Sequence, residues 1–220
     1  IQRFFAEAQI TAALKHPNTI SVFDFGQTEG GALYIAMELL DGQDLNALLG
    51  ELAAQGKALD QAETIRIAVQ VLRSLAEAHM VGLVHRDLNP PNIFLNQVPG
   101  DESVVKVLDF GIAKRLGTNL TGTGQSFGTP AYMSPEQAAT RRMGIDHRTD
   151  IFSLGATFYE ALTLIRPFNG DTSQQVFQQI LLADPPNPRE VRSRVPRDLA
   201  VICLKALEKM PEQRYPSMGA

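Results

Sequence analysis

Two carboxylates and one amide stand at the ends of short apolar runs, where their side chains could bind a metal ion. Asp87 and Asn92 come before the run Ile93–Leu95, and Asp109 comes directly after the run Val104–Leu108. Oxygen atoms of Asp and Asn side chains are ligands for hard divalent cations. This set contains one carboxylate more than the metal site needs. Such a set suits the transfer of a phosphoryl group, in which catalysis consists mostly of positioning and charge neutralisation.

The two apolar runs must be arranged so that these side chains meet. Each run has the length of a short strand, and Pro99-Gly100-Asp101 between them is typical of a turn. The sequence therefore predicts a β-hairpin. This hairpin would hold Asp87, Asn92 and Asp109 on one side of a cleft.

The order of these residues resembles the catalytic loop and the metal-binding loop of protein kinases, H-R-D-L-x-x-x-N followed by D-F-G. The chain contains, in this order, His85-Arg86-Asp87-Leu88, Asn92 and Asp109-Phe110-Gly111. A lone D-F-G arises often by chance, whereas the ordered set is highly specific. The chain is similar to the eukaryotic-like (Hanks-type) serine/threonine protein kinases of bacteria. This resemblance implies an α+β fold of two lobes, with a partial small β lobe and a mainly helical large lobe.

The whole chain has the composition of an ordinary globular protein. It has 220 residues, of which 44% are hydrophobic and 20% charged, and its net charge is −4. This charge gives no general attraction to nucleic acids or anionic membranes, and no apolar run approaches the roughly 20 residues of a membrane span. The single cysteine, Cys203, excludes an internal disulfide and is expected to be a buried thiol. We expect a cytoplasmic domain with no nucleic-acid partner and no membrane segment of its own.

The resemblance covers the chain from end to end. It assigns residues 1–37 to the remainder of the small lobe, 38–44 to the hinge and 45–220 to the large lobe. The chain lacks an initial Met and starts inside a helical pattern, so we expect a kinase domain truncated at both ends. The Gly-rich loop and the strand lysine would then lie before residue 1, and this fragment alone is expected to be inactive. The sequence leaves open whether the full-length protein has a membrane anchor elsewhere.

Local patterns predict the elements around the site. Helical spacing predicts a helix over residues 1–15, and alternating apolar residues predict strands over 19–26 and 32–39. A long helix begins after Asp60, which with Glu63 forms a capping-box-like pair. Its buried stripe is predicted to comprise Ile65, Ala68, Val69, Leu72 and Ala76.

The resemblance places ATP between the lobes. Glu7 would pair with the strand lysine, and the backbone groups of Glu38 and Leu40 would bind the adenine. Asp44 would reach the ribose, or would simply cap the helix that follows it. The implied nucleotide-binding residues are Met37, Glu38, Leu40, Asp44, Phe94, Asn92 and Asp109.

The resemblance also assigns the chemistry. Asp87 would orient the acceptor hydroxyl and accept its proton late, while Asn92 and Asp109 would hold Mg²⁺, or Mn²⁺, on the ATP phosphates. His85 is expected to be a packed core residue and not a base.

The segment after Asp109 carries the regulatory residues that the resemblance implies. Phosphorylation is expected at Thr121 or Thr123, with Arg86 receiving the phosphate, although both threonines can also be read as ordinary loop residues. Thr129 is typical of serine/threonine kinases. Autophosphorylation in trans would require a transient homodimer.

Three more residues have implied structural roles. Glu136 is expected to pair with Arg214, late in the chain. Asp150 is expected to anchor the backbone of the catalytic loop from below; by itself it could also be a favourable charge at the start of a helix.

Asn89 departs from the resembled pattern, which usually has a lysine there. Losing a cation from a transition state typically costs roughly 10²–10³-fold in rate, so Asn89→Lys is expected to raise turnover. Two functions stay open. One is transfer of the γ-phosphoryl group of ATP to Ser and Thr hydroxyls of proteins in signalling; the other is a pseudokinase that serves as a regulatory scaffold. Asp87, Asn92 and Asp109 favour the enzyme, because a scaffold needs no metal ligands.

Overall fold

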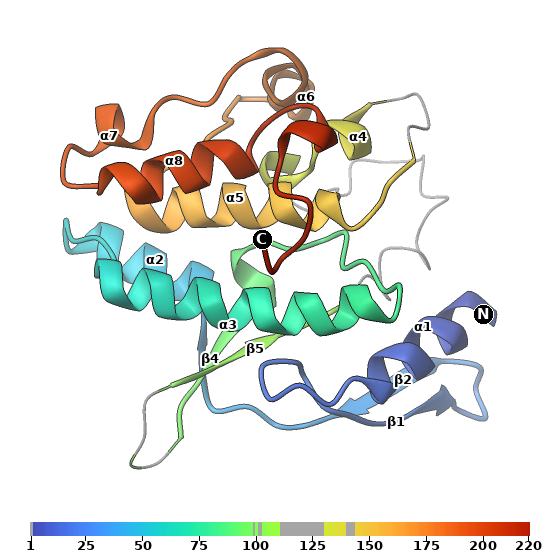
Figure 1. Cartoon of the computed structure of the whole chain (residues 1–220). Helices are drawn as coiled ribbons and strands as arrows, with labels where there is room; N and C mark the ends of the chain where they lie inside the picture. The colour runs from blue at the N-terminus through green and yellow to red at the C-terminus, as the bar shows by residue number, and fades with distance from the viewer. Residues whose placement is uncertain (1, 99, 101–102, 111–129, 140–143) are drawn as a thin grey trace.

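The computed structural model describes residues 2–98, 100, 103–110, 130–139 and 144–220. Figure 1 shows α1, β1 and β2 on one side of the molecule and the longer helices stacked on the other. The described α-helices are α1 (Gln2–Ala13), α2 (Leu45–Ala54), α3 (Gln61–Met80), α4 (Pro135–Ala138), α5 (Arg148–Thr163), α6 (Ser173–Leu182), α7 (Pro188–Val191) and α8 (Arg197–Ala206). The described strands are β1 (Val22–Gln27), β2 (Leu33–Met37), β3 (Gly42–Asp44), β4 (Ile93–Asn96) and β5 (Val104–Val107). Short 3₁₀ helices are η1 (Pro90–Asn92), η2 (Pro130–Tyr132) and η3 (Pro211–Gln213).

The small part consists of the antiparallel pair β1–β2 with α1 beside it. The rings of Phe5 and Phe25 lie 6.2 Å apart between α1 and β1. The first strand is shorter than the sequence predicts, because it starts at Val22 and not at Thr19. Residues before Val22 bind the large part of the molecule instead.

This connection between the two parts is built on Asn18 and Thr19, which are both buried. Thr19 forms a parallel bridge with Val107 of β5, and the Asn18 side chain donates to the Val105 carbonyl oxygen at 2.8 Å. The hydroxyls of Thr19 and Ser74 share a hydrogen bond of 2.7 Å. The segment before β1 is therefore fixed to both α3 and β5.

The second sheet has the order β3-β4-β5, all antiparallel. The predicted hairpin is confirmed as β4 and β5, in which Phe94 pairs with Lys106. At Gly42 the backbone has φ 133°, and a Cβ atom there would lie 2.2 Å from the Leu95 carbonyl oxygen. Glycine is therefore required where β3 approaches β4.

The helix α3 crosses the centre of the large part. Asp60 accepts from the backbone N–H groups of Ala62 and Glu63, so the predicted cap is present, whereas the Glu63 side chain pairs with Arg66. The predicted buried stripe is confirmed only in part: Ile65 is 43% exposed, and the other four predicted residues are partly buried, with Leu72 and Ala76 packed against the core. The buried side chains of α3 are Thr64, Ile67, Val71, Ser74, Leu75 and Ala78. Apolar residues lie on both of these faces, and periodicity alone selected the less buried one.

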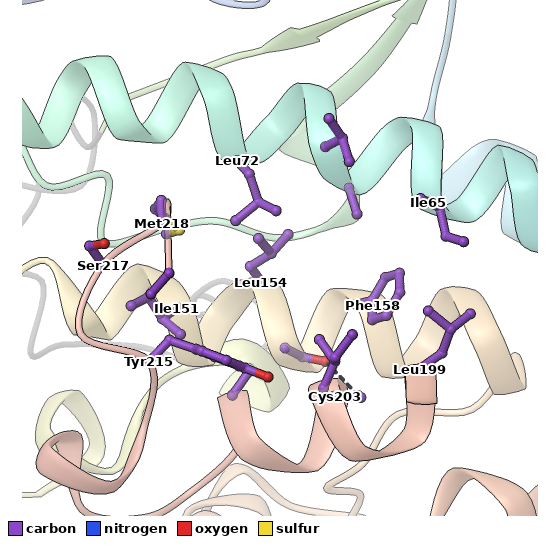
Figure 2. A pocket seen from close by; sticks show the side chains of 16 residues that line it. Ile65, Leu72, Ile151, Leu154, Phe158, Leu199, Cys203, Tyr215, Ser217 and Met218 are labelled. Atoms are coloured by element: carbon purple, nitrogen blue, oxygen red, sulfur yellow. Dashed lines mark hydrogen bonds between the residues drawn. The ribbon is translucent and has the colours of Figure 1, made fainter. Parts of the chain in front are cut away.

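The face predicted from the sequence lines an apolar pocket of about 310 Å³ between α3, α5 and α8. Figure 2 shows Ile65 and Leu72 of α3 facing Leu154 and Phe158 of α5, with the last residues of the chain at one end. Cys203 is buried at the edge of this pocket, as expected, and burial raises the pKa of its thiol. The pocket is formed entirely by the large part and does not include the residues of the site below.

Candidate active site

Asp150 holds the backbone of the predicted catalytic loop. It lies in the first turn of α5, and its side chain is fully buried. Its carboxylate accepts from the backbone N–H groups of His85 and Arg86, each at 2.8 Å. It also makes a 2.8 Å contact with His79 Nε2 of α3. The expected contact of Asp150 with the loop backbone is thus present, and the contact with His79 adds a second helix to the support.

His85 links the catalytic loop to the D-F-G segment. Its Nε2 atom makes a 2.7 Å hydrogen bond with the Leu108 carbonyl oxygen, and its ring lies 4.8 Å from the ring of Phe110. Its Nδ1 atom accepts from the backbone N–H of Asp87 at 3.3 Å. His85 is fully buried. The prediction of a packed core histidine is confirmed.

Asp87 and the two asparagines form one hydrogen-bonded cluster. The Asn92 side chain donates to the Asp87 carbonyl oxygen at 2.8 Å. The Asn89 side chain donates to the same oxygen at 2.9 Å and to Asp87 Oδ1 at 3.2 Å. The backbone N–H of Leu108 donates to the Asn92 carbonyl oxygen at 2.9 Å, next to Asp109. Hydrogen bonds thus join the two backbone segments that carry the three side chains proposed for base and metal.

The residues at this point suit a hard divalent cation. The amide nitrogen of Asn92 faces the Asp87 carbonyl oxygen, so its oxygen is the atom that can serve as a ligand. Asp109 is exposed, with φ 50°, and Arg86 has φ 66°. Positive φ values are uncommon outside glycine and cluster at functional sites. Amide and carboxylate oxygens fit Mg²⁺, whose remaining ligands in such sites come from water and phosphate.

The segment predicted to form the hinge is anchored through the side chain of Glu38. Its Oε1 atom accepts from the backbone N–H of Ser21 at 2.7 Å and from Lys106 Nζ at 2.8 Å. Burial alone would raise the pKa of Glu38, but these hydrogen bonds outweigh it and hold that pKa below its ordinary value. Glu38 therefore joins the small part to β5 directly after β2. Lys106 carries no role in the sequence-based interpretation.

Three more residues that are predicted to bind the nucleotide lie in or directly before the predicted hinge. Met37 ends β2 and is 43% exposed, while Leu40 is partly buried. Asp44 pairs with Phe94 between β3 and β4, and its carboxylate accepts from the Ala47 N–H at 2.8 Å. The capping role of Asp44 is thus present, and its contact with ribose stays a prediction.

The residues at the end of the segment that is predicted to be regulatory are bonded to the large part of the molecule. Glu136 and Arg214 form the expected pair, and the two side chains are almost fully buried. Gln137 accepts from the Ser134 N–H at 3.0 Å and donates to the Arg86 carbonyl oxygen at 2.7 Å. The pattern Ser-Pro-Glu-Gln could have indicated the capping interaction, but no sequence signal pointed to the bond with Arg86.

Some predicted site residues lie outside the described part of the chain. These are Thr121, Thr123 and Thr129. Glu7 belongs to α1, but its side chain is likewise outside the description.

Comparisons with known proteins agree with this geometry. The protein kinase domain family matches residues 1–219. The chain is 41% identical to the serine/threonine-protein kinase Pkn3 of Myxococcus xanthus, with 100% of this chain and 40% of Pkn3 covered. It is 38% identical to the serine/threonine-protein kinase PknB of Mycobacterium leprae, with 97% and 33% covered. The chain thus spans well under half the length of these relatives.

The fold is similar to that of a solved structure, the kinase domain of Mycobacterium tuberculosis PknI in a C20A_R136A double mutant. The TM-score is 0.77 at 27% identity, and 99% of this chain and 74% of that chain are covered. The expected α+β, two-lobed fold is confirmed, with α1 and the sheet of β1 and β2 on one side and the longer helices on the other (Figure 1). The chain belongs to the protein kinase domain family, among the Hanks-type serine/threonine kinases of bacteria.

Proposed function

We propose that the protein transfers the γ-phosphoryl group of ATP to Ser and Thr hydroxyls of other proteins, in cytoplasmic signalling. The observation that carries this proposal is the connected cluster of base and metal ligands. Asn92 donates to the carbonyl oxygen of Asp87, and the backbone of Asn92 is bonded to Leu108, which precedes Asp109. These two bonds join the backbone of the proposed base to the backbone that carries the two proposed metal ligands.

The residues of the chain have distinct tasks in this reaction. Residues 38–44 form the hinge between a small lobe (1–37) and a large lobe (45–220), and the backbone of Glu38 and Leu40 holds the adenine. Asp87 orients the acceptor hydroxyl and accepts its proton as the new bond forms. A bound Mg²⁺ or Mn²⁺ neutralises the phosphate charge, and Asn92 and Asp109 are the residues that would hold it.

Regulation by phosphorylation is part of the proposal. Arg86 follows His85 in the catalytic loop, and its Nε atom is buried without a hydrogen-bond partner among the described residues. A buried donor of this kind is costly unless an acceptor arrives. A phosphate on Thr121 or Thr123 would supply charged oxygens, and transfer between two copies would require a transient homodimer.

The test uses the full-length protein, labelled ATP and a generic basic protein, with Asp87→Asn as the inactive control. We expect transfer by the wild type in Mg²⁺, loss of transfer in Asp87→Asn, and loss on chelation that Mg²⁺ or Mn²⁺ reverses. Peptides with a single Ser, Thr or Tyr identify the acceptor. Equal signals from the wild type and Asp87→Asn would refute the proposal.

A pseudokinase is the second candidate, and Asn89 in place of the usual lysine favours it. A pseudokinase can retain the fold and bind partners while transferring no phosphoryl group. Binding of ATP with Mg²⁺ without measurable turnover, in the full-length protein and with several acceptors, would support this alternative.

A further inference from the structure

Asn89 uses both ends of its side-chain amide inside the catalytic loop. Its Nδ2 atom donates to Asp87 Oδ1 at 3.2 Å and to the Asp87 carbonyl oxygen at 2.9 Å. Its Oδ1 atom accepts from the backbone N–H of Asn92 at 3.2 Å, and this bond caps the start of η1. One side chain therefore contacts the proposed base and the backbone of a proposed metal ligand.

The contact with Asp87 Oδ1 restricts the proposed base. The plane of an Asp carboxylate turns easily, because the torsion angle about its Cβ–Cγ bond has a broad distribution. At 3.2 Å the bond from Asn89 to Asp87 Oδ1 lies at the long end of the usual N–H···O range, but the charge of the acceptor strengthens it relative to a bond between neutral groups. An amide that is itself fixed at Asn92 can therefore select one orientation of the Asp87 carboxylate.

We propose that Asn89 is a positioning residue, which sets the orientation of the Asp87 carboxylate relative to Asn92. The inference rests on the proposed function, because it assigns Asp87 the part of the base. It also replaces the interpretation in which Asn89 matters only because it lacks the positive charge of the usual lysine. Its amide keeps a donor for the base and adds an acceptor for the loop backbone.

The chemistry of other side chains explains why an amide suits this position. Lysine has three donors and no acceptor, so it can reach Asp87 but cannot cap η1. Aspartate can accept from Asn92, but it cannot donate when ionised and would place a second negative charge beside Asp87. Asparagine has both a donor and an acceptor without a net charge.

Two uncharged variants separate the two contacts. In Asn89→Ser the hydroxyl can still cap η1, because Ser and Asn are comparable N-cap residues, but the side chain is too short to hold the Asp87 carboxylate. In Asn89→Ala both contacts are lost. Comparison of the two variants therefore distinguishes an effect on the position of the base from an effect on the stability of the loop.

Kinetics and thermal unfolding of the full-length variants test the role. In Asn89→Ser we expect kcat to fall about tenfold, with the KM for ATP within about twofold of wild type and an unchanged unfolding midpoint. In Asn89→Ala we expect the same loss of kcat with a lower midpoint. A wild-type kcat in Asn89→Ser would overturn the inference and leave Asn89 as a cap. A higher KM with unchanged kcat would also overturn it, because the role would then be in nucleotide binding.

Crystal structures of the wild type and Asn89→Ser give a readout that needs no turnover. We expect one orientation of the Asp87 carboxylate in the wild type and a second orientation in the variant. The same single orientation in both would overturn the inference. Failure of the proposed function looks different, since the wild type would then transfer no more phosphate than Asp87→Asn while the crystal structures would still decide the positioning role.

Discussion

Glu136 and Arg214 lie 78 residues apart in the sequence and form a buried ion pair through two hydrogen bonds of 2.8 Å each. The exposed fractions of their side chains are 3% and 0%. Arg214 also donates to the carbonyl oxygens of Glu208, Arg148 and Lys209. The pair therefore joins α4, α5 and the segment after α8 at one point.

Replacing Arg214 by methionine is expected to destabilise the domain strongly. The variant leaves the Glu136 carboxylate buried without its cation, which typically costs about 3–5 kcal/mol in the free energy of unfolding. Urea unfolding measures the loss. The control is Arg148→Met, which removes an arginine paired with Asp146 at 24% and 43% exposure; a surface pair of this kind contributes about 0–1 kcal/mol. Equal losses in the two variants would contradict a special role of the buried pair.

The same pair makes stability depend on pH. Burial would raise the pKa of Glu136, but the hydrogen bonds and charge of Arg214 outweigh it, so the folded pKa lies below the ordinary value of 4.5. The stabilising contribution is therefore complete above pH 4.5 and is lost as the pH falls through the lowered folded pKa.

Glu136→Gln tests this dependence, because glutamine has no proton to gain. We expect the variant to be less stable at neutral pH, and its unfolding free energy to fall less steeply than that of the wild type below about pH 4.5. Urea unfolding at several pH values provides both curves. Parallel curves would show that Glu136 does not contribute to the acid sensitivity.

The contact between Lys106 and Glu38 is expected to affect nucleotide binding. Lys106→Met removes the partner of the Glu38 carboxylate, which joins the residue before β1 to β5. We expect the KM for ATP to rise about two- to tenfold with little change in kcat, since uniform binding is lost and the base is untouched. The control is Lys57→Met, which removes an equal charge from an exposed loop. A reduced kcat with unchanged KM would show that Lys106 acts on the chemistry instead.

Asn89→Lys is expected to raise turnover while lowering stability. The lysine keeps a donor for Asp87 and adds a positive charge for the transferring phosphoryl group, but it cannot accept from the Asn92 N–H. The Asn92 N–H keeps its 3.0 Å bond to the carbonyl oxygen of residue 89, so the lost side-chain cap should cost at most about 1 kcal/mol in unfolding free energy. Steady-state kinetics and thermal unfolding of the full-length protein measure the two effects. Unchanged turnover would mean that another cation already serves the phosphate.

Local spacing was enough to predict the hairpin, whereas the catalytic loop and the distant pairing of Glu136 with Arg214 were predicted from the resemblance to a family. The hairpin follows from two apolar runs and a turn, which are local features. The pairing followed from resemblance to a family, because nothing local to residues 136 and 214 connects them.

Tertiary structure decided how these pieces meet. The buried face of α3 depends on which neighbours cover it, and an apolar pocket lies against the face that periodicity favoured. The segment around Asn18 joins β5 and not only its own sheet.

Asn89 shows most clearly what the sequence alone indicates and what only the folded structure determines. Its identity alone indicated a missing positive charge. The folded loop brings its two polar ends to Asp87 and Asn92. Hydrogen bonds depend on distance and direction, which the sequence does not state and which the packing of the loop against α5 and β5 sets.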